Sequence, residues 1–140
     1  MTDNVYIYEN DVTWSLPCLF QYEAVFGAMQ HFVEMLGYKH FKAELYGAPS
    51  CCWTGGRKPV LYEKMTPEIL ARLFEYLKRY NAIPVFAFNN TQLKKDDFKD
   101  EYCNMMLDVA VQHNAKFMVY NDDLKKYIKD KYPQAFIIAS

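Results

Sequence analysis

The sequence predicts an α/β fold in which five parallel strands alternate with four helices. Short apolar segments typical of strands are separated by segments with helical periodicity, in the order β-α-β-α-β-α-β-α-β. Connections between them are short, and the segment 83–88 is almost wholly apolar, as in a strand covered on both faces. All 140 residues fit one domain, residues 1–140. Two architectures remain open: a half or truncated (β/α)8 barrel, and an open three-layer sheet.

In the first half of the chain, β-branched and aromatic residues predict a strand at 5–8. Residues 14–20 are expected to be irregular because Pro17 interrupts them. Apolar residues at helical spacing predict a helix over 25–36, and the second strand is expected at 41–46.

In the second half, Thr66 and the proline that follows it predict a helix start, and Asn81 is suited to a left-handed cap at the other end. The third strand, 83–88, is followed by a helix that we expect to begin near Asp96 or Asp97. A fourth strand at 116–120 leads to Asp122, which can cap a helix ending at 131. The fifth strand is expected at 135–139.

Composition excludes several classes of function. The net charge of −1 provides no overall attraction to nucleic acid, and no stretch has the length of a membrane span. The N-terminus lacks the basic and apolar regions of a signal peptide, so we expect a soluble, cytoplasmic protein. Its four cysteines have no CxxC spacing, which predicts reduced thiols and no metal site, and no cofactor can be named.

The loop after the second predicted strand concentrates unusual residues. It holds three of the five glycines, of which Gly55 and Gly56 precede Arg57, together with Trp53 and two adjacent cysteines. Glycine permits positive φ or the close approach of another group. We expect Arg57 to bind a carboxylate or phosphate and Trp53 to form a stacking wall. The alternative is a long turn in which Trp53 fills the core.

Polar residues follow every predicted strand, and the carboxyl ends of parallel strands share one edge of a sheet. This edge is expected to carry Glu9 and Arg57 as candidate catalytic residues, Glu9 as general base or metal ligand and Arg57 as the residue that holds an anionic substrate. The candidate ligand-binding residues are Trp53, Gly55, Gly56, Asn89, Asn90, Asn121 and Asp122. Asn and Asp are also common turn and cap residues, which is the structural alternative for them.

The thiols give a weaker prediction. Cys51 or Cys52 could act as a nucleophile or form a vicinal disulfide with redox function, but adjacent cysteines cannot readily both bind one tetrahedral metal ion. Cys103 is expected to be a small core residue of the third helix.

A set of segments between residues 40 and 140 resembles a known family. They are Tyr46-Gly47, Trp53-Thr54-Gly55-Gly56-Arg57, Ile83-Pro84-Val85 with Asn89, Tyr102-Cys103-Asn104, Asn121-Asp122-Asp123-Leu124, Tyr127-Ile128, Tyr132-Pro133 and Ser140. This arrangement is similar to the N-terminal half of peptidase U32-like (β/α)-barrel proteins, whose uncharacterised bacterial members have a Trp-Asn-Gly-Gly-Arg loop. Thr54 replaces the Asn of that loop.

The resemblance implies a barrel scaffold with Arg57, Asn89 and Asn121 at its mouth, and a hydrolase or modifying-enzyme fragment. The cysteines do not reproduce the iron–sulfur ligands of the wider family.

Two functions remain as hypotheses. The first is a half-barrel domain that binds a small polar or anionic molecule at the carboxyl ends of its strands, with enzymatic activity uncertain. The second is a non-catalytic binding or assembly module that forms homodimers through exposed sheet edges.

Overall fold

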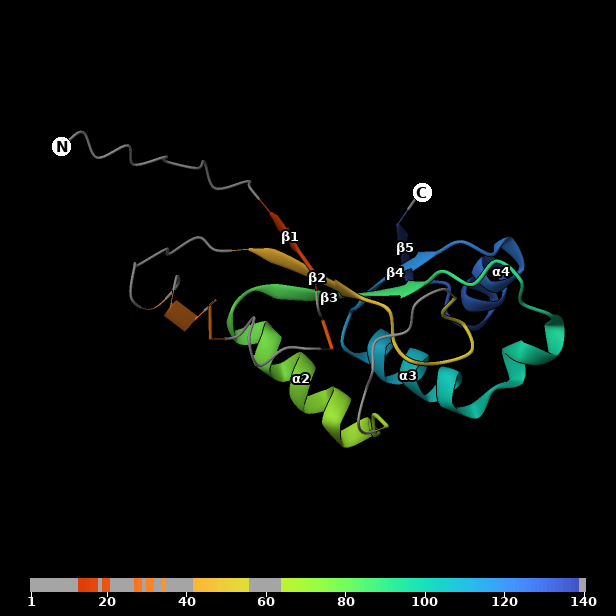
Figure 1. Cartoon of the computed structure of the whole chain (residues 1–140), viewed down its shortest axis with the longest axis horizontal. Coiled ribbons are helices and arrows are strands. Elements are labelled where there is room, and N and C mark those ends of the chain that lie inside the picture. The colour runs from red at the N-terminus through yellow and green to blue at the C-terminus, as the bar shows by residue number, and fades with distance from the viewer. Residues whose placement is uncertain are drawn as a thin grey trace.

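The computed structural model describes residues 13–17, 19–20, 27–28, 30–31, 34, 42–55 and 64–138. Its elements are β1 (Trp14–Leu16), β2 (Ala43–Gly47), α2 (Pro67–Arg79), β3 (Ala82–Phe88), the 3₁₀ helix η2 (Lys95–Lys99), α3 (Glu101–Gln112), β4 (Lys116–Val119), α4 (Asp122–Lys131) and β5 (Phe136–Ile138) (Figure 1). The predicted α/β alternation is confirmed. The strand expected at 5–8 lies outside the described residues, as does most of the helix expected over 25–36.

All five strands are parallel and lie in the sheet in the order in which they occur in the chain, β1-β2-β3-β4-β5. A doubly wound sheet reverses its strand order part-way, whereas a barrel wall does not. Because right-handed crossovers in a constant direction leave the sheet on the same side, the connecting helices cover one face. The described strands therefore have the order found in a barrel wall. Because the sheet is not closed, they form only part of such a wall.

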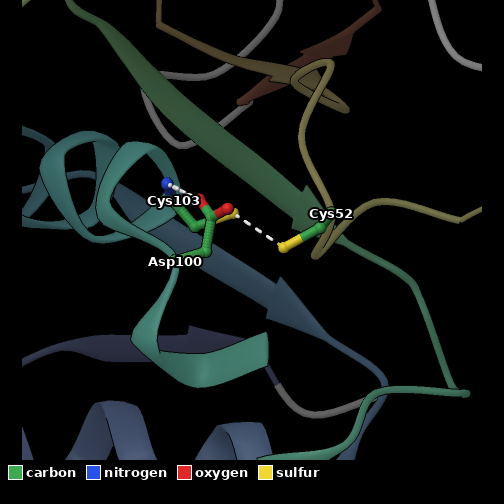
Figure 2. A group of neighbouring side chains, drawn as sticks. All are labelled: Cys52, Asp100 and Cys103. Atoms are coloured by element: carbon green, nitrogen blue, oxygen red, sulfur yellow. Dashed lines mark hydrogen bonds between the residues drawn. The ribbon is translucent and has the colours of Figure 1, made fainter. Parts of the chain in front are cut away.

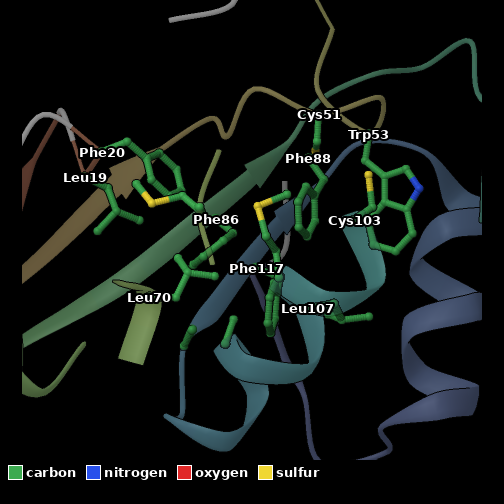
Figure 3. Packing of buried hydrophobic residues seen from close by; sticks show 14 of the residues in the cluster. Leu19, Phe20, Cys51, Trp53, Leu70, Phe86, Phe88, Cys103, Leu107 and Phe117 are labelled. Atoms are coloured by element: carbon green, nitrogen blue, oxygen red, sulfur yellow. The ribbon is translucent and has the colours of Figure 1, made fainter. Parts of the chain in front are cut away.

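The core lies between the sheet and its helices, with α2 and α3 below the sheet in Figure 1. Phe86, Phe88 and Phe117 point from β3 and β4 into this layer and are fully buried, with the Phe88 and Phe117 rings stacked at 6.1 Å. Leu70 of α2 and Leu107 of α3 meet them from the helix side (Figure 3). Burial of these large side chains is the main stabilising contribution to the fold.

The opposite side of the sheet carries alternate residues of the same strands, which we call the open face. Its members are Glu44, Tyr46, Ile83, Val85, Ala87, Lys116, Met118, Phe136 and Ile138, placed together by the strand register. The side chains of Tyr46, Ile83 and Phe136 are 39%, 37% and 56% exposed. In a parallel sheet with helices on both faces, apolar side chains of this size are buried. Within the described residues, no helix packs on this face.

The start and end of α2 agree with the sequence prediction. The Thr66 hydroxyl accepts a hydrogen bond from the Ile69 N–H at 3.2 Å, and Pro67 is the first helical residue. Asn81 follows the helix with φ of 52°, in the left-handed conformation that asparagine tolerates. Local sequence signals are sufficient here because each cap depends on neighbouring residues.

Two predictions were wrong in their placement. Residues 14–16 form β1 rather than an irregular segment, because pairing with β2 supplies hydrogen bonds that the local sequence does not indicate. The third helix begins at Glu101 rather than near Asp96 or Asp97. The Asp97 carboxylate instead accepts the Lys94 N–H at 2.7 Å and starts η2, and Asp100 caps α3.

Among the described residues, none of the helices has the length and apolar character needed to cross a membrane.

Candidate functional site

The loop after β2 folds across the carboxyl end of β3 and is held there by two asparagines. Asn89 Oδ1 accepts the Gly55 N–H at 2.8 Å, and Asn90 Nδ2 donates to the Cys52 carbonyl at 2.9 Å. The Asn90 backbone N–H also donates to the Trp53 carbonyl at 3.1 Å. Both side chains therefore have a structural role, since they satisfy backbone groups of a loop outside regular secondary structure.

The described glycines of this region provide close approach rather than positive φ. A Cβ at Gly47 would lie 2.8 Å from Leu19 Cβ, and a Cβ at Gly55 would lie 3.1 Å from Asn90 Cα. The first distance is shorter than ordinary contact, so any side chain at Gly47 requires Leu19 to move. The described part of the loop is therefore packed tightly at Gly47 and at Gly55.

Trp53 lies in the core and not on a binding surface. Its side chain is fully buried, its Nε1 donates to the Asp97 carbonyl at 2.8 Å, and its ring meets Phe88 and Tyr127 edge-on at 5.2 and 6.1 Å. It thus has no exposed face on which a ligand could stack. This placement is the alternative in which the tryptophan fills the core.

Asn121 and Asp122 differ from each other in their roles. Asn121 Oδ1 accepts the Leu124 N–H at 2.9 Å and caps α4, while its Nδ2 donates to the Thr91 carbonyl at 3.4 Å. Asp122, predicted as the cap, is the first residue of the helix; it is exposed and pairs with Lys125 at 3.0 Å. Glu9, Gly56 and Arg57 lie outside the described residues.

Three cysteines come together at this edge of the sheet. Cys51 and Cys52 belong to the loop after β2, and Cys103 lies in the first turn of α3. The Cys52 and Cys103 sulfurs are 3.5 Å apart, and the Asp100 carboxylate lies within 4.8 Å of both (Figure 2). Cys103 is fully buried, as predicted, whereas Cys52 and Asp100 are partly exposed.

Hydrogen bonds and burial alter the acidity of this group. Burial raises the pKa of Asp100, but hydrogen bonds from the Cys103 N–H and from the two thiols more than offset it, so the pKa of Asp100 is lowered. Interaction with the Cys103 thiol lowers the pKa of Cys51 and, in return, raises the pKa of Cys103. Burial raises the pKa of Cys52. The Asp100 carboxylate is therefore ionised at neutral pH.

Comparisons of the chain with protein-family models, with curated proteins and with solved structures found no match. Inference about the site therefore depends on its geometry.

The contact between the loop cysteines and Cys103 was not predicted from the sequence, because 51 positions separate Cys52 from Cys103. One signal was available. In a parallel sheet whose strands follow chain order, the loop after one strand adjoins the start of the helix after the next.

Proposed function

We propose that this chain is a half-barrel module that assembles with a second copy of itself through the open face and the flanking strand edges. The observation that carries the proposal is the exposure of Tyr46, Ile83 and Phe136 on a sheet face that no described helix covers. Exposed large apolar side chains on one face of a sheet commonly mark an interaction surface in a soluble protein. In a closed barrel, the corresponding face is the packed interior.

The charged residues of the open face are compatible with burial. Lys116 of β4 forms an ion pair with Glu44 of β2, across the intervening strand β3, and Lys116 Nζ lies 4.9 Å from the centre of the Phe136 ring. A buried charge is costly chiefly when it has no partner. Because the pair is satisfied within one chain, covering the face leaves neither charge unpaired.

A second copy fits the geometry of the sheet edges. In the described residues, β1 and β5 are the outermost strands, and each pairs with only one neighbour. A two-fold axis along the strand direction would place β5 of each copy beside β1 of the other, with the strands parallel. The chain's net charge of −1 opposes such association only weakly.

The experiment is light scattering of the purified chain over a range of concentrations, with two charge variants. Ile83→Lys places a cation at an exposed position of the open face, beside Glu44 in the sheet register, where the added charge has an opposite charge next to it in the monomer. Gln112→Lys is the matched control, because it adds the same charge at an exposed residue near the end of α3. We expect a dimer for the native chain and the control, and a monomer for Ile83→Lys.

A native chain that stays monomeric at every concentration would contradict the proposal, and so would an Ile83→Lys variant that still dimerises. A stable complex should bury about 800 Å² of each partner. One substituted residue within such a surface has a large effect because interface energy is concentrated in a few buried side chains.

Ligand binding at the carboxyl edge is the second candidate, and it includes the U32-like hydrolase or modifying activity implied by the sequence resemblance. It is favoured by the hydrogen bonds that tie the ends of β2, β3 and β4 together, through Asn89, Asn90 and Asn121. A thermal-shift screen of small carboxylates and phosphates tests it. A ligand that raises Tm of the native chain but not of Arg57→Ala supports it, since binding stabilises only the form that binds. Equal shifts in both proteins would contradict it.

A further inference from the structure

Cys51, Cys52 and Cys103 lie close together at the carboxyl edge of the sheet, and neither of the proposed functions requires this arrangement. We propose that Cys52, Cys103 and Asp100 bind a zinc ion at the carboxyl edge of the sheet. Their candidate ligand atoms, two thiol sulfurs and a carboxylate oxygen, lie within 4.8 Å of one another. Figure 2 shows the Cys52 side chain pointing from the loop toward Cys103, with the Asp100 carboxylate beside the Cys103 sulfur.

The sulfur separation fits a shared ion. Two thiolates at about 2.3 Å from a tetrahedral zinc ion lie about 3.8 Å apart. The observed separation of 3.5 Å between the Cys52 and Cys103 sulfurs needs only a small adjustment to reach that value. A disulfide would require a larger movement, to a sulfur separation of about 2.05 Å.

The surroundings fix two of the ligands before any ion arrives. Asp100 Oδ1 accepts the Cys103 N–H at 2.7 Å, which holds the carboxylate and the Cys103 backbone together at the start of α3. Asn90 Nδ2 donates to the Cys52 carbonyl at 2.9 Å, which fixes the loop that carries the other thiol. Such supporting hydrogen bonds orient metal ligands and strengthen binding.

The donor set favours zinc over calcium or magnesium. Soft thiolates bind zinc and copper(I), whereas calcium and magnesium require oxygen ligands. On binding Zn²⁺, each of the two thiols loses its proton to solvent while Asp100 is already ionised, so two protons are released for each ion bound. The resulting site has two thiolates and one carboxylate, with net charge −1 around the divalent ion.

Cys51 is not one of the proposed zinc ligands. Its sulfur lies 3.7 Å from Thr54 Oγ1, and its side chain is buried, whereas Cys52 is partly exposed. Adjacent cysteines do not readily bind the same tetrahedral ion, so only Cys52 of the pair is placed in the ligand set. Three protein ligands leave the fourth position for water or another small ligand, as in catalytic rather than structural zinc sites.

The experiment titrates the full chain, reduced with a phosphine and freed of metal by a chelator, with zinc in competition with a chromophoric chelator. We expect binding of one ion per chain. Cobalt(II) titration should give sulfur-to-cobalt charge-transfer absorption, a signature that requires thiolate ligands. Alkylation of Cys52 and Cys103, measured by mass spectrometry of peptides, should slow when zinc is present.

Variants identify the ligands. Cys52→Ser is expected to weaken zinc binding by more than about 100-fold. This is more than the roughly 10- to 100-fold loss that follows when a residue hydrogen-bonded to a metal ligand is removed. Asp100→Asn keeps a good helix cap but removes the charged ligand, so binding should weaken while thermal stability without metal is unchanged. Cys51→Ala is the matched control and should retain zinc and the cobalt spectrum.

Three results would overturn the proposal. One is a reduced native chain that takes up no zinc in competition with the chelator. Another is a Cys51→Ala variant that loses the ion while Cys52→Ser retains it. The third is equal binding by Asp100→Asn and the native chain.

Discussion

Trp53 is the side chain whose loss should best measure how firmly the loop after β2 is built into the fold. It is fully buried, and its indole donates to the Asp97 carbonyl at 2.8 Å. Trp53→Phe leaves a void of roughly 40 Å³, which costs about 1 kcal/mol at about 24 cal/mol per Å³. Loss of the hydrogen bond adds about 1 kcal/mol. The free energy of unfolding should therefore fall by about 2 kcal/mol.

Urea denaturation followed by far-ultraviolet circular dichroism measures this change, with a chelator present so that bound metal adds no stability. Trp14→Phe is the matched control, because the Trp14 side chain is 44% exposed and its replacement should change stability by less than about 0.5 kcal/mol. Equal effects of the two substitutions would refute the reasoning that Trp53 joins the loop to the core.

Three further predictions concern packing, loop anchoring and pH. Gly47→Ala should destabilise the chain by about 1–3 kcal/mol, because the added Cβ is overpacked against its neighbours. Gly27→Ala is the control and should not destabilise it, because nothing lies within 4 Å of the added Cβ. Urea denaturation midpoints of the two variants measure the difference. Asn89→Ala should speed amide exchange in the loop while Asn89→Asp, which keeps the acceptor oxygen, should not; equal exchange would show that this hydrogen bond does not anchor the loop. Burial and the hydrogen bond to Asp108 raise the pKa of Tyr132 from 10.0 to about 12. The folded state thus holds the phenol proton more tightly, and this stabilising contribution, complete below pH 10, is lost as pH rises toward 12. Tyr132→Phe should reduce that loss in urea midpoints measured across the range, and an unchanged pH dependence would contradict it.

The sequence was most informative where structure depends on near neighbours. The α2 start at Thr66 and the left-handed Asn81 were predictable because a cap involves residues within one turn. The third strand was predicted at 83–88 and observed at Ala82–Phe88, because its apolar run has the length of a buried strand. At α4, Asn121 and Asp122 were both suitable caps, and residue type alone does not show which one turns its side chain back to the helix.

The rest depends on contacts between distant segments. Strand β1 has only three residues and exists through its pairing with β2, so residue preferences around Pro17 could not reveal it. The same limit applies to the site. The sequence identified the loop as special, but Asn89 and Asn90 could have faced either a ligand or the loop backbone, and only the fold shows that they bind the backbone.

The order of strands in the sheet has a consequence for how the chain acquires its structure. Among the strands that the structure describes, none pairs with one that is more than one step away along the chain. Each strand and helix can therefore be added to a preceding unit without threading through a finished layer, as in repeat proteins, where stability is a sum over adjacent units. Protection against hydrogen exchange should then be greatest at β3, the central strand of the five, and decline toward β1 and β5. A wall built in this way can also lengthen by duplication at either edge while every existing pairing is kept.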